Sequence, residues 1–177
     1  MRFILISILF IQALFGQYFG QNKVQYNEFD WNFIVSPNFN VYYYGDNHDL
    51  AIFTSKVAEE SLDQIGKHLR WRSQKPIKII VYTSHNDFQQ TNIVNVYMSE
   101  GIGGVTELYK NRIVIPFEGS YAQFKHVIHH ELVHAIINDM IYGGNVQGVL
   151  SGRVLLQVPL WANEGLAEFL SVDWDTK

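Results

Sequence analysis

The stretch HHELVHAIIND, residues 129–139, carries a pattern that predicts a helix and a metal site together. His130 and His134 are four residues apart, so in a helix their side chains lie on nearly the same face, about 6 Å apart along the axis. Neutral imidazole is a good ligand for zinc. Glu131 lies about 100° round the helix from His130, where it can approach the ion without binding it and take a proton from a zinc-bound water.

Residues 120–141 are expected to form one long helix around this pattern. Ser120 is a candidate N-cap, and Gly143 and Gly144 are expected to end the helix. Apolar residues at four-residue spacing predict its core face: Phe124, Ile128, Leu132, Ile136 and Met140. The alternative is a helix that merely carries surface or buried histidines. The pattern by itself favours zinc over that alternative, and a catalytic zinc site also needs a third protein ligand.

A third ligand is expected in a second helix, WANEGLAEF, residues 161–169. Glu164 and Glu168 are four residues apart and share a helix face. Glu164 can bind the ion while Glu168 accepts a hydrogen bond from the outer nitrogen of a liganding histidine. Taken alone, the two glutamates are more typical of a solvated acidic face. With the histidines they make three protein ligands, which leaves the open fourth position of a catalytic zinc site.

Together, HELVH at residues 130–134 and WANEGLAEF at residues 161–169 resemble the motifs of the gluzincin metallopeptidases, a group that includes the thermolysin-like and aminopeptidase-N-like families. The resemblance implies a zincin-like fold and Zn2+ as cofactor. It also implies these roles: His130, His134 and Glu164 as zinc ligands, Glu131 as catalytic base, and Glu168 as the carboxylate that supports a liganding histidine. The string NFNVYYY, residues 38–44, also resembles peptidase MA-like domains at the front of bacterial envelope proteins with β-propeller repeats.

Two features depart from that pattern. Twenty-nine residues separate His134 from Glu164, which is longer than is usual in well-known gluzincins, and residues 142–152 look like the inserted part. Loop insertions of this kind cost little free energy. The resembling families also continue beyond the third-ligand helix. We therefore expect a metallopeptidase domain at residues 17–177 that is truncated at its C-terminal end.

The remaining pattern predicts an α+β fold, with a mixed β-sheet packed on the active-site helix and on the ligand helix that follows it. The expected strands and helices outside the two motifs are two strands around a turn within 31–45, a helix at 49–70 capped by Asp46 or Asp49, a strand at 77–84, a short helix or turn at 85–92, and a strand at 112–115.

The strand RIVIP, residues 112–116, has two interpretations. As in the resembling families, Ile113, Val114 and Ile115 can bind substrate if this strand is a sheet edge that pairs with an extended peptide. An ordinary core strand fits the same residues equally well. The glycine-rich loop before it, residues 101–104, lacks the Lys-Ser/Thr ending of a phosphate-binding loop, so a nucleotide site is disfavoured.

Other histidines and tyrosines are secondary candidates. A His126–His130 metal pair has the right spacing, but an exposed or capping His126 fits better because no glutamate follows it. His129 points about 100° away from His130 and is expected next to the site or at the surface. Tyr109 and Tyr142 are candidate oxyanion donors, and the sequence does not choose between them.

Composition limits the class of protein. The chain has 177 residues, 47% of them apolar, and a formal charge of −4, which gives no broad attraction to nucleic acid. It has no cysteine, so disulfides and cysteine-based zinc sites are excluded. Residues 1–16 contain Arg2, an apolar run and then Gly16, as in a cleaved signal peptide. The run is too short for the ~30 Å hydrocarbon core, so no stable membrane span is expected.

These features together predict an exported zinc metallopeptidase, located in the periplasm, in the cell envelope or outside the cell. It would hydrolyse peptide or protein substrates through a zinc-bound water that Glu131 activates. The alternative is a non-catalytic, zinc-stabilised binding or scaffold domain of a larger envelope protein. Substrate specificity and oligomeric state are not indicated by the sequence.

Overall fold

The computed structural model describes residues 23–73, 75–94, 98–99, 101–108, 110–142 and 158–171. The elements in these ranges, in chain order, are β1 (Trp31–Val35), β2 (Phe39–Tyr44), α2 (His48–Leu69), β3 (Ile77–Tyr82), α3 (His85–Phe88), β4 (Val105–Glu107), β5 (Arg112–Pro116), α4 (Tyr121–Tyr142) and α6 (Leu160–Ser171). The predicted signal peptide at 1–16, both glycines expected to end α4, and residues 145–157 of the connector lie outside the described residues.

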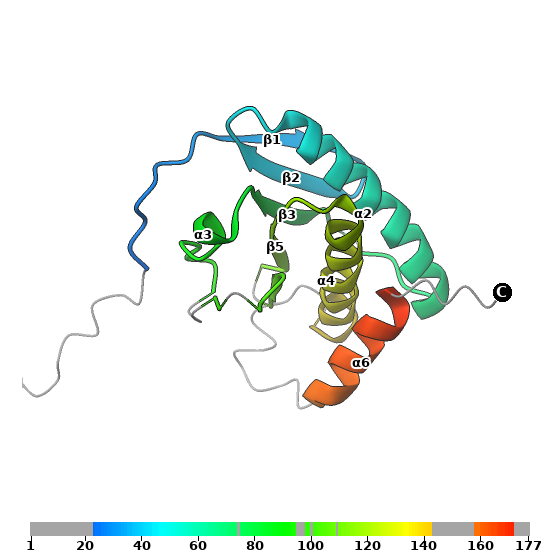
Figure 1. Ribbon diagram of the computed structural model, residues 1–177. Helices are drawn as coiled ribbons and strands as arrows, with labels where there is room; N and C mark the ends of the chain where they lie inside the picture. Colours follow the sequence, from blue (N-terminus) through cyan, green and yellow to red (C-terminus); the bar gives the residue numbers. More distant parts are fainter. Residues whose placement is uncertain are drawn as a thin grey trace, which may run out of the picture.

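A mixed five-stranded sheet forms the centre of the fold (Figure 1). Its strand order is β1-β2-β3-β5-β4; the three inner strands are parallel, and β1 and β4 pair antiparallel at the two edges. Val41 pairs with Ile79, and Ile79 pairs with Ile113, so one row of β-branched residues crosses the inner strands. The α+β class and the mixed sheet predicted from the sequence are confirmed.

Helices α2 and α4 cover one face of the sheet, and α3 lies on the other side (Figure 1). Alternate residues of a strand point to opposite faces, so neighbours such as Ile79 and Ile80 enter different clusters. The larger cluster joins strands to helices through fully buried side chains that include Phe39, Ile65, Ile79, Ile115, Ile128, Leu132 and Ile136. Each such aliphatic side chain stabilises the fold by about 1.5–3 kcal/mol.

Helix α4 begins where the sequence predicts. The backbone N–H of Phe124 donates to the carbonyl oxygen of Ser120 at 2.9 Å, and the N–H of Gln123 lies 3.4 Å from the Ser120 hydroxyl. Four of the five predicted core positions are buried, but Met140 is 38% exposed, so that prediction was wrong. Each four-residue step passes a full turn by about 40°, so the fifth position has drifted about 160° from Phe124.

The predicted cap of α2 was also wrong. Asn47 precedes the helix, and its side chain forms no cap; its Nδ2 instead donates to the carbonyl oxygen of Tyr44 at 2.7 Å. That bond holds the turn between β2 and α2, so the side chain stabilises the loop and leaves the helix end uncapped.

Strand β5 lies inside the sheet, which corrects the edge-strand interpretation of residues 112–116. Ile113, Val114 and Ile115 are completely buried, and β5 is paired with β3 on one side and β4 on the other. A peptide therefore has no free backbone edge to pair with at these three residues. The interpretation as a core strand is the one that holds, and β4 is the last strand of the sheet among the described residues.

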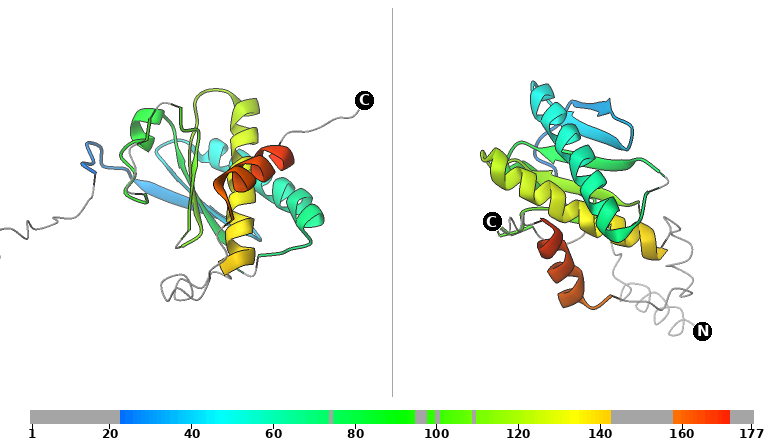
Figure 2. Two further views of the ribbon diagram at one scale, coloured as in Figure 1. Left: turned by 90° about the horizontal axis from the view of Figure 1, so that it is seen from below. Right: turned by 90° about the vertical axis from the view of Figure 1, so that its right-hand side faces the viewer.

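Helix α6 packs across α4, at a steep angle to it (Figure 2). The contact buries Ala167, while Leu160, Trp161 and Phe169 are exposed. Among the described helices, none is both long enough and apolar enough to cross a membrane.

Candidate metal centre

Three potential ligand atoms meet where α6 crosses α4. The Nε2 atoms of His130 and His134 are 3.1 Å apart. Glu164 Oε2 lies 3.4 Å from the first nitrogen and 3.5 Å from the second. Zinc ligands at 2.0–2.1 Å in a tetrahedron are about 3.3 Å from one another, so one zinc ion fits these three atoms. Both imidazoles are largely shielded from solvent, whereas Glu164 is half exposed.

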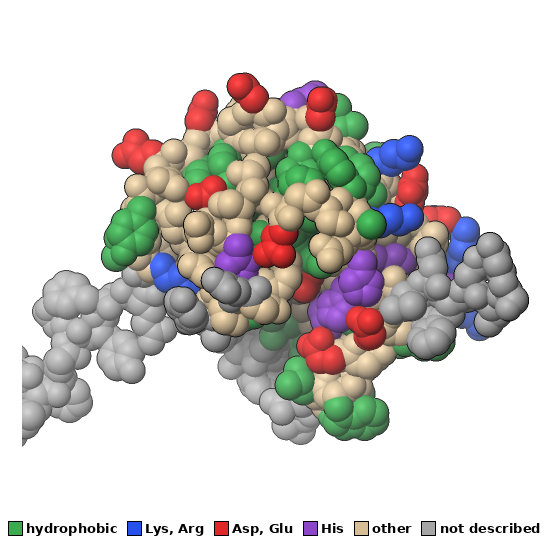
Figure 3. Space-filling model, viewed as in Figure 1, with side chains coloured by type: hydrophobic (Ala, Val, Ile, Leu, Met, Phe, Trp, Pro, Cys, Tyr) green, Lys and Arg blue, Asp and Glu red, His purple; other side chains and the backbone are tan. Residues whose placement is uncertain are grey.

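The site opens into a cavity of about 660 Å³. Residues from three parts of the chain line it: β4 with the residues just before and after it, one side of α4 from His126 to Tyr142, and α6 from Asn163 to Glu168. Figure 3 shows histidine side chains gathered against acidic ones where α6 lies beside α4. A cavity of this size, with a few convergent polar groups, suits a ligand of several heavy atoms.

Glu131 lies beside the three ligand atoms and is not one of them. Its side chain is 7% exposed, and its Oε2 accepts a hydrogen bond of 2.7 Å from the Thr106 hydroxyl. The same hydroxyl lies 2.9 Å from the Glu131 carbonyl oxygen, so Thr106 ties β4 to this turn of α4. Gly104 makes that approach possible, because a Cβ there would lie 2.8 Å from Glu131 Cγ.

Burial shifts the ionisation of two groups at this site. Burial raises the pKa of Glu131, and the nearby Glu164 carboxylate adds to that, while the Thr106 hydroxyl and His134 oppose it. Burial and then the neighbouring His134 lower the pKa of His130, against the opposing pull of Glu164 and Glu168. A raised carboxyl pKa suits a general base near neutral pH, and a lowered imidazole pKa favours the neutral form that binds metal.

The other predicted residues take up definite positions around the site. Glu168 Oε2 lies 3.6 Å from His130 Nδ1, the outer nitrogen of that ligand, which is an ion-pair distance and slightly too long for a hydrogen bond. His129 is buried, so it is not a surface histidine. Tyr142 lines the cavity, and Tyr109 lies outside the described residues. His134 Nδ1 is buried without a hydrogen-bond partner in the described part of the chain.

Sequence reasoning missed Thr106 and Gly104. Both lie 25 or more residues before Glu131 in the chain, and β4 brings them beside it. The glycine-rich loop is visible in the sequence, but its composition suggests only a phosphate-binding loop, which is disfavoured there. A loop glycine directly before a short strand was the one available signal of a close backbone approach.

Comparison with protein-family models, with curated proteins and with solved structures finds no match to this chain. Its function is therefore inferred from its own residues and their geometry.

Proposed function

We propose that this chain is a zinc-dependent metallopeptidase domain of gluzincin type with a zincin-like fold. The observation that carries the proposal is the triangle of His130 Nε2, His134 Nε2 and Glu164 Oε2, with edges of 3.1–3.5 Å and a buried, unliganded Glu131 beside it. A purely structural zinc site needs four ligands and no general base, whereas a catalytic site has three and an open position. Export follows only from the pattern at residues 1–16 and is part of the same proposal.

His130, His134 and Glu164 would hold the ion. Zinc, when bound, supplies a Lewis acid that polarises a carbonyl group and makes a water molecule more acidic. Glu131 takes the proton of the attacking water and passes it to the leaving amine, for which its raised pKa suits it. The hydrogen bond from Thr106 holds the Glu131 carboxylate toward the cavity.

Strand β4 provides the position for an extended peptide. It forms the end of the sheet, lines the cavity through Val105 and Thr106, and in the described residues pairs only with β5. An extended peptide added to a sheet edge makes backbone hydrogen bonds there and places its scissile bond beside the metal triangle. This replaces Ile113, Val114 and Ile115 as the proposed peptide-pairing residues.

The decisive experiment compares zinc-loaded wild type with Glu131→Gln on a peptide library, with zinc content measured by mass spectrometry. Glu131→Gln should retain about one zinc per chain and lose about 10²–10⁴-fold in turnover, because the base is removed and the ligands remain. Glu60→Gln, an exposed glutamate on α2, is the matched control and should keep full activity. Equal hydrolysis by Glu131→Gln would overturn the mechanism. Zinc binding without cleavage by any variant would favour the non-catalytic binding domain.

A further inference from the structure

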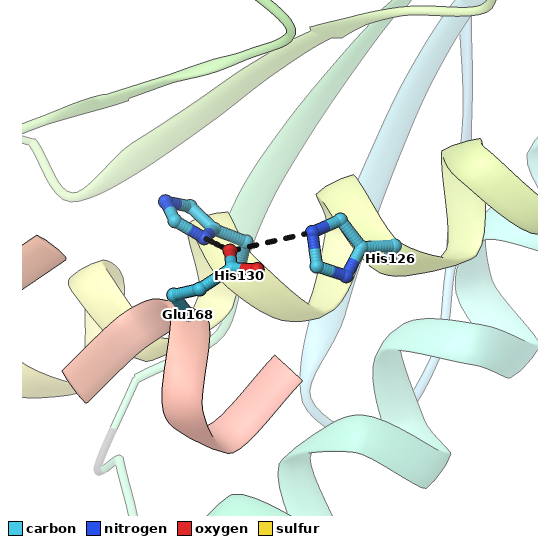
Figure 4. Close-up of side chains that lie close together, drawn as sticks. All are labelled: His126, His130 and Glu168. Atoms are coloured by element: carbon cyan, nitrogen blue, oxygen red, sulfur yellow. Dashed lines mark ion pairs between the residues drawn. The ribbon is translucent and has the colours of Figure 1, made fainter. Parts of the chain in front are cut away.

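A second set of potential ligand atoms lies at the other nitrogen of the His130 ring (Figure 4). His130 Nε2 faces Glu164, while its Nδ1 lies 3.6 Å from Glu168 Oε2. His126, one turn earlier on α4, places its Nε2 3.6 Å from the same Glu168 oxygen. One carboxylate oxygen from α6 therefore lies between two imidazole nitrogens from α4.

These atoms have the chemistry and spacing of a divalent-metal site. Two imidazole nitrogens and a carboxylate oxygen are ligands that zinc prefers, and all three atoms lie within 4.8 Å of one another. The two measured edges exceed the ~3.3 Å of a tetrahedral zinc site by only a few tenths of an ångström. The side chains of His126 and Glu168 are 40% and 59% exposed, so they can adjust and an ion can enter from solvent.

We propose that His126, Glu168 and the Nδ1 atom of His130 form a second, weaker zinc site that competes with the first for His130. A neutral imidazole has one free nitrogen lone pair, so a second ion that binds His130 Nδ1 leaves the first ion on His134 and Glu164, where it stays bound more weakly. The second site is weaker because its atoms are further apart and its carboxylate is more exposed than the atoms of the first.

Occupation of the second site also engages Glu168 as a ligand, so Glu168 no longer supports His130 as a ligand of the first ion. Carboxylates that support liganding histidines contribute about 10–100-fold to metal affinity. Excess zinc should therefore weaken the first site and inhibit hydrolysis. The inhibition rests on the proposed peptidase function, but the binding of a second ion does not.

The test is a zinc titration of the full chain, followed by competition with a chromophoric chelator. Wild type should bind a second zinc equivalent at least about tenfold more weakly than the first, a difference of about 1.4 kcal/mol. His126→Ala and His126→Gln should lose that second equivalent and keep the first. His68→Ala, an exposed histidine on α2, is the matched control and should behave as wild type.

A second equivalent that persists in both His126 variants, or wild type that saturates at one zinc, would overturn the second site. Hydrolysis distinguishes this failure from failure of the proposed function. If the His126 variants lose the second zinc equivalent and the wild type shows no peptidase activity, the second site is supported and the proposed peptidase function is contradicted. Zinc-inhibited hydrolysis that is relieved in His126→Ala supports both, whereas equal inhibition in the two proteins contradicts inhibition through the second site.

Discussion

At the scale of single residues, the Thr106 hydroxyl is the contact that orients the proposed base. Thr106→Val keeps the shape of the side chain and removes its 2.7 Å hydrogen bond to Glu131. A hydrogen bond to a charged group is worth about 1.5–3 kcal/mol, so we expect kcat to fall about 10–100-fold while KM and zinc content stay unchanged. Steady-state kinetics of the zinc-loaded protein measure this. Thr106→Ser keeps the donor and should recover most of the rate; a change confined to KM would contradict the positioning role.

Glu131 also makes stability depend on pH in the metal-free chain. Burial raises the pKa of Glu131 in the folded chain. As the pH rises above about 4.3, Glu131 therefore ionises in the unfolded chain before it ionises in the folded chain. The free energy of unfolding falls over this range until the pH passes the pKa of Glu131 in the folded chain. Glu131→Gln removes that loss and can still accept the Thr106 hydrogen bond. We expect Glu131→Gln to need more urea than the wild type to unfold at pH 7.5, with the difference shrinking toward pH 4.5. If Glu131→Gln stabilised the chain equally at both pH values, the ionisation of buried Glu131 would not be the cause.

At the scale of elements, β4 can lie against α4 only because position 104 has no side chain. A Cβ there would approach Glu131 Cγ at 2.8 Å and Ile115 Cγ2 at 2.9 Å. Gly104→Ala must therefore move β4 or the base, and we expect at least a tenfold loss of turnover together with about 1–3 kcal/mol of destabilisation. Activity assays and urea unfolding measure the two effects.

Gly101→Ala is the control for this change, because a Cβ at Gly101 meets nothing within 4 Å. It lies in the same loop and should keep both activity and stability. Wild-type behaviour of Gly104→Ala would show that the loop can relax, and that the close approach is not needed to place Glu131.

At the scale of the whole molecule, α6 packs on the core through Ala167 and the half-buried Leu166 and Leu170, while Leu160, Trp161 and Phe169 stay exposed. Ala167 is its one fully buried residue in the described structure, whereas two of its glutamates reach the histidines of α4. We expect chelation of zinc to speed amide hydrogen exchange in α6 by at least about tenfold and to leave β3 and β5 nearly unchanged. Exchange followed by mass spectrometry, with and without chelator, measures this. Equal protection of the α6 amides with and without chelator would mean that packing alone holds the helix.

The sequence predicted most elements because their signals are local. Hydrophobic spacing located α2 and α4, and β-branched runs located β3 and β5. Errors arose where a local rule was extended too far, as for Met140, and at the start of α2, where Asn47 precedes the helix in place of the predicted caps Asp46 and Asp49. The sequence left β5 open between an edge strand and a core strand, because strand order depends on contacts between distant segments.

The sequence by itself determined that His130, Glu131 and His134 occupy neighbouring positions on one helix, because four residues make about one turn in any helix. It also placed Glu164 and Glu168 one turn apart. Tertiary structure alone decided that α6 crosses α4, which brings Glu164 within 3.5 Å of both imidazoles across 29 intervening residues. Packing likewise placed Thr106 on Glu131, and Glu168 between His126 and His130. Helical periodicity acts over a few residues, whereas these contacts depend on how whole elements bury their apolar faces against one another.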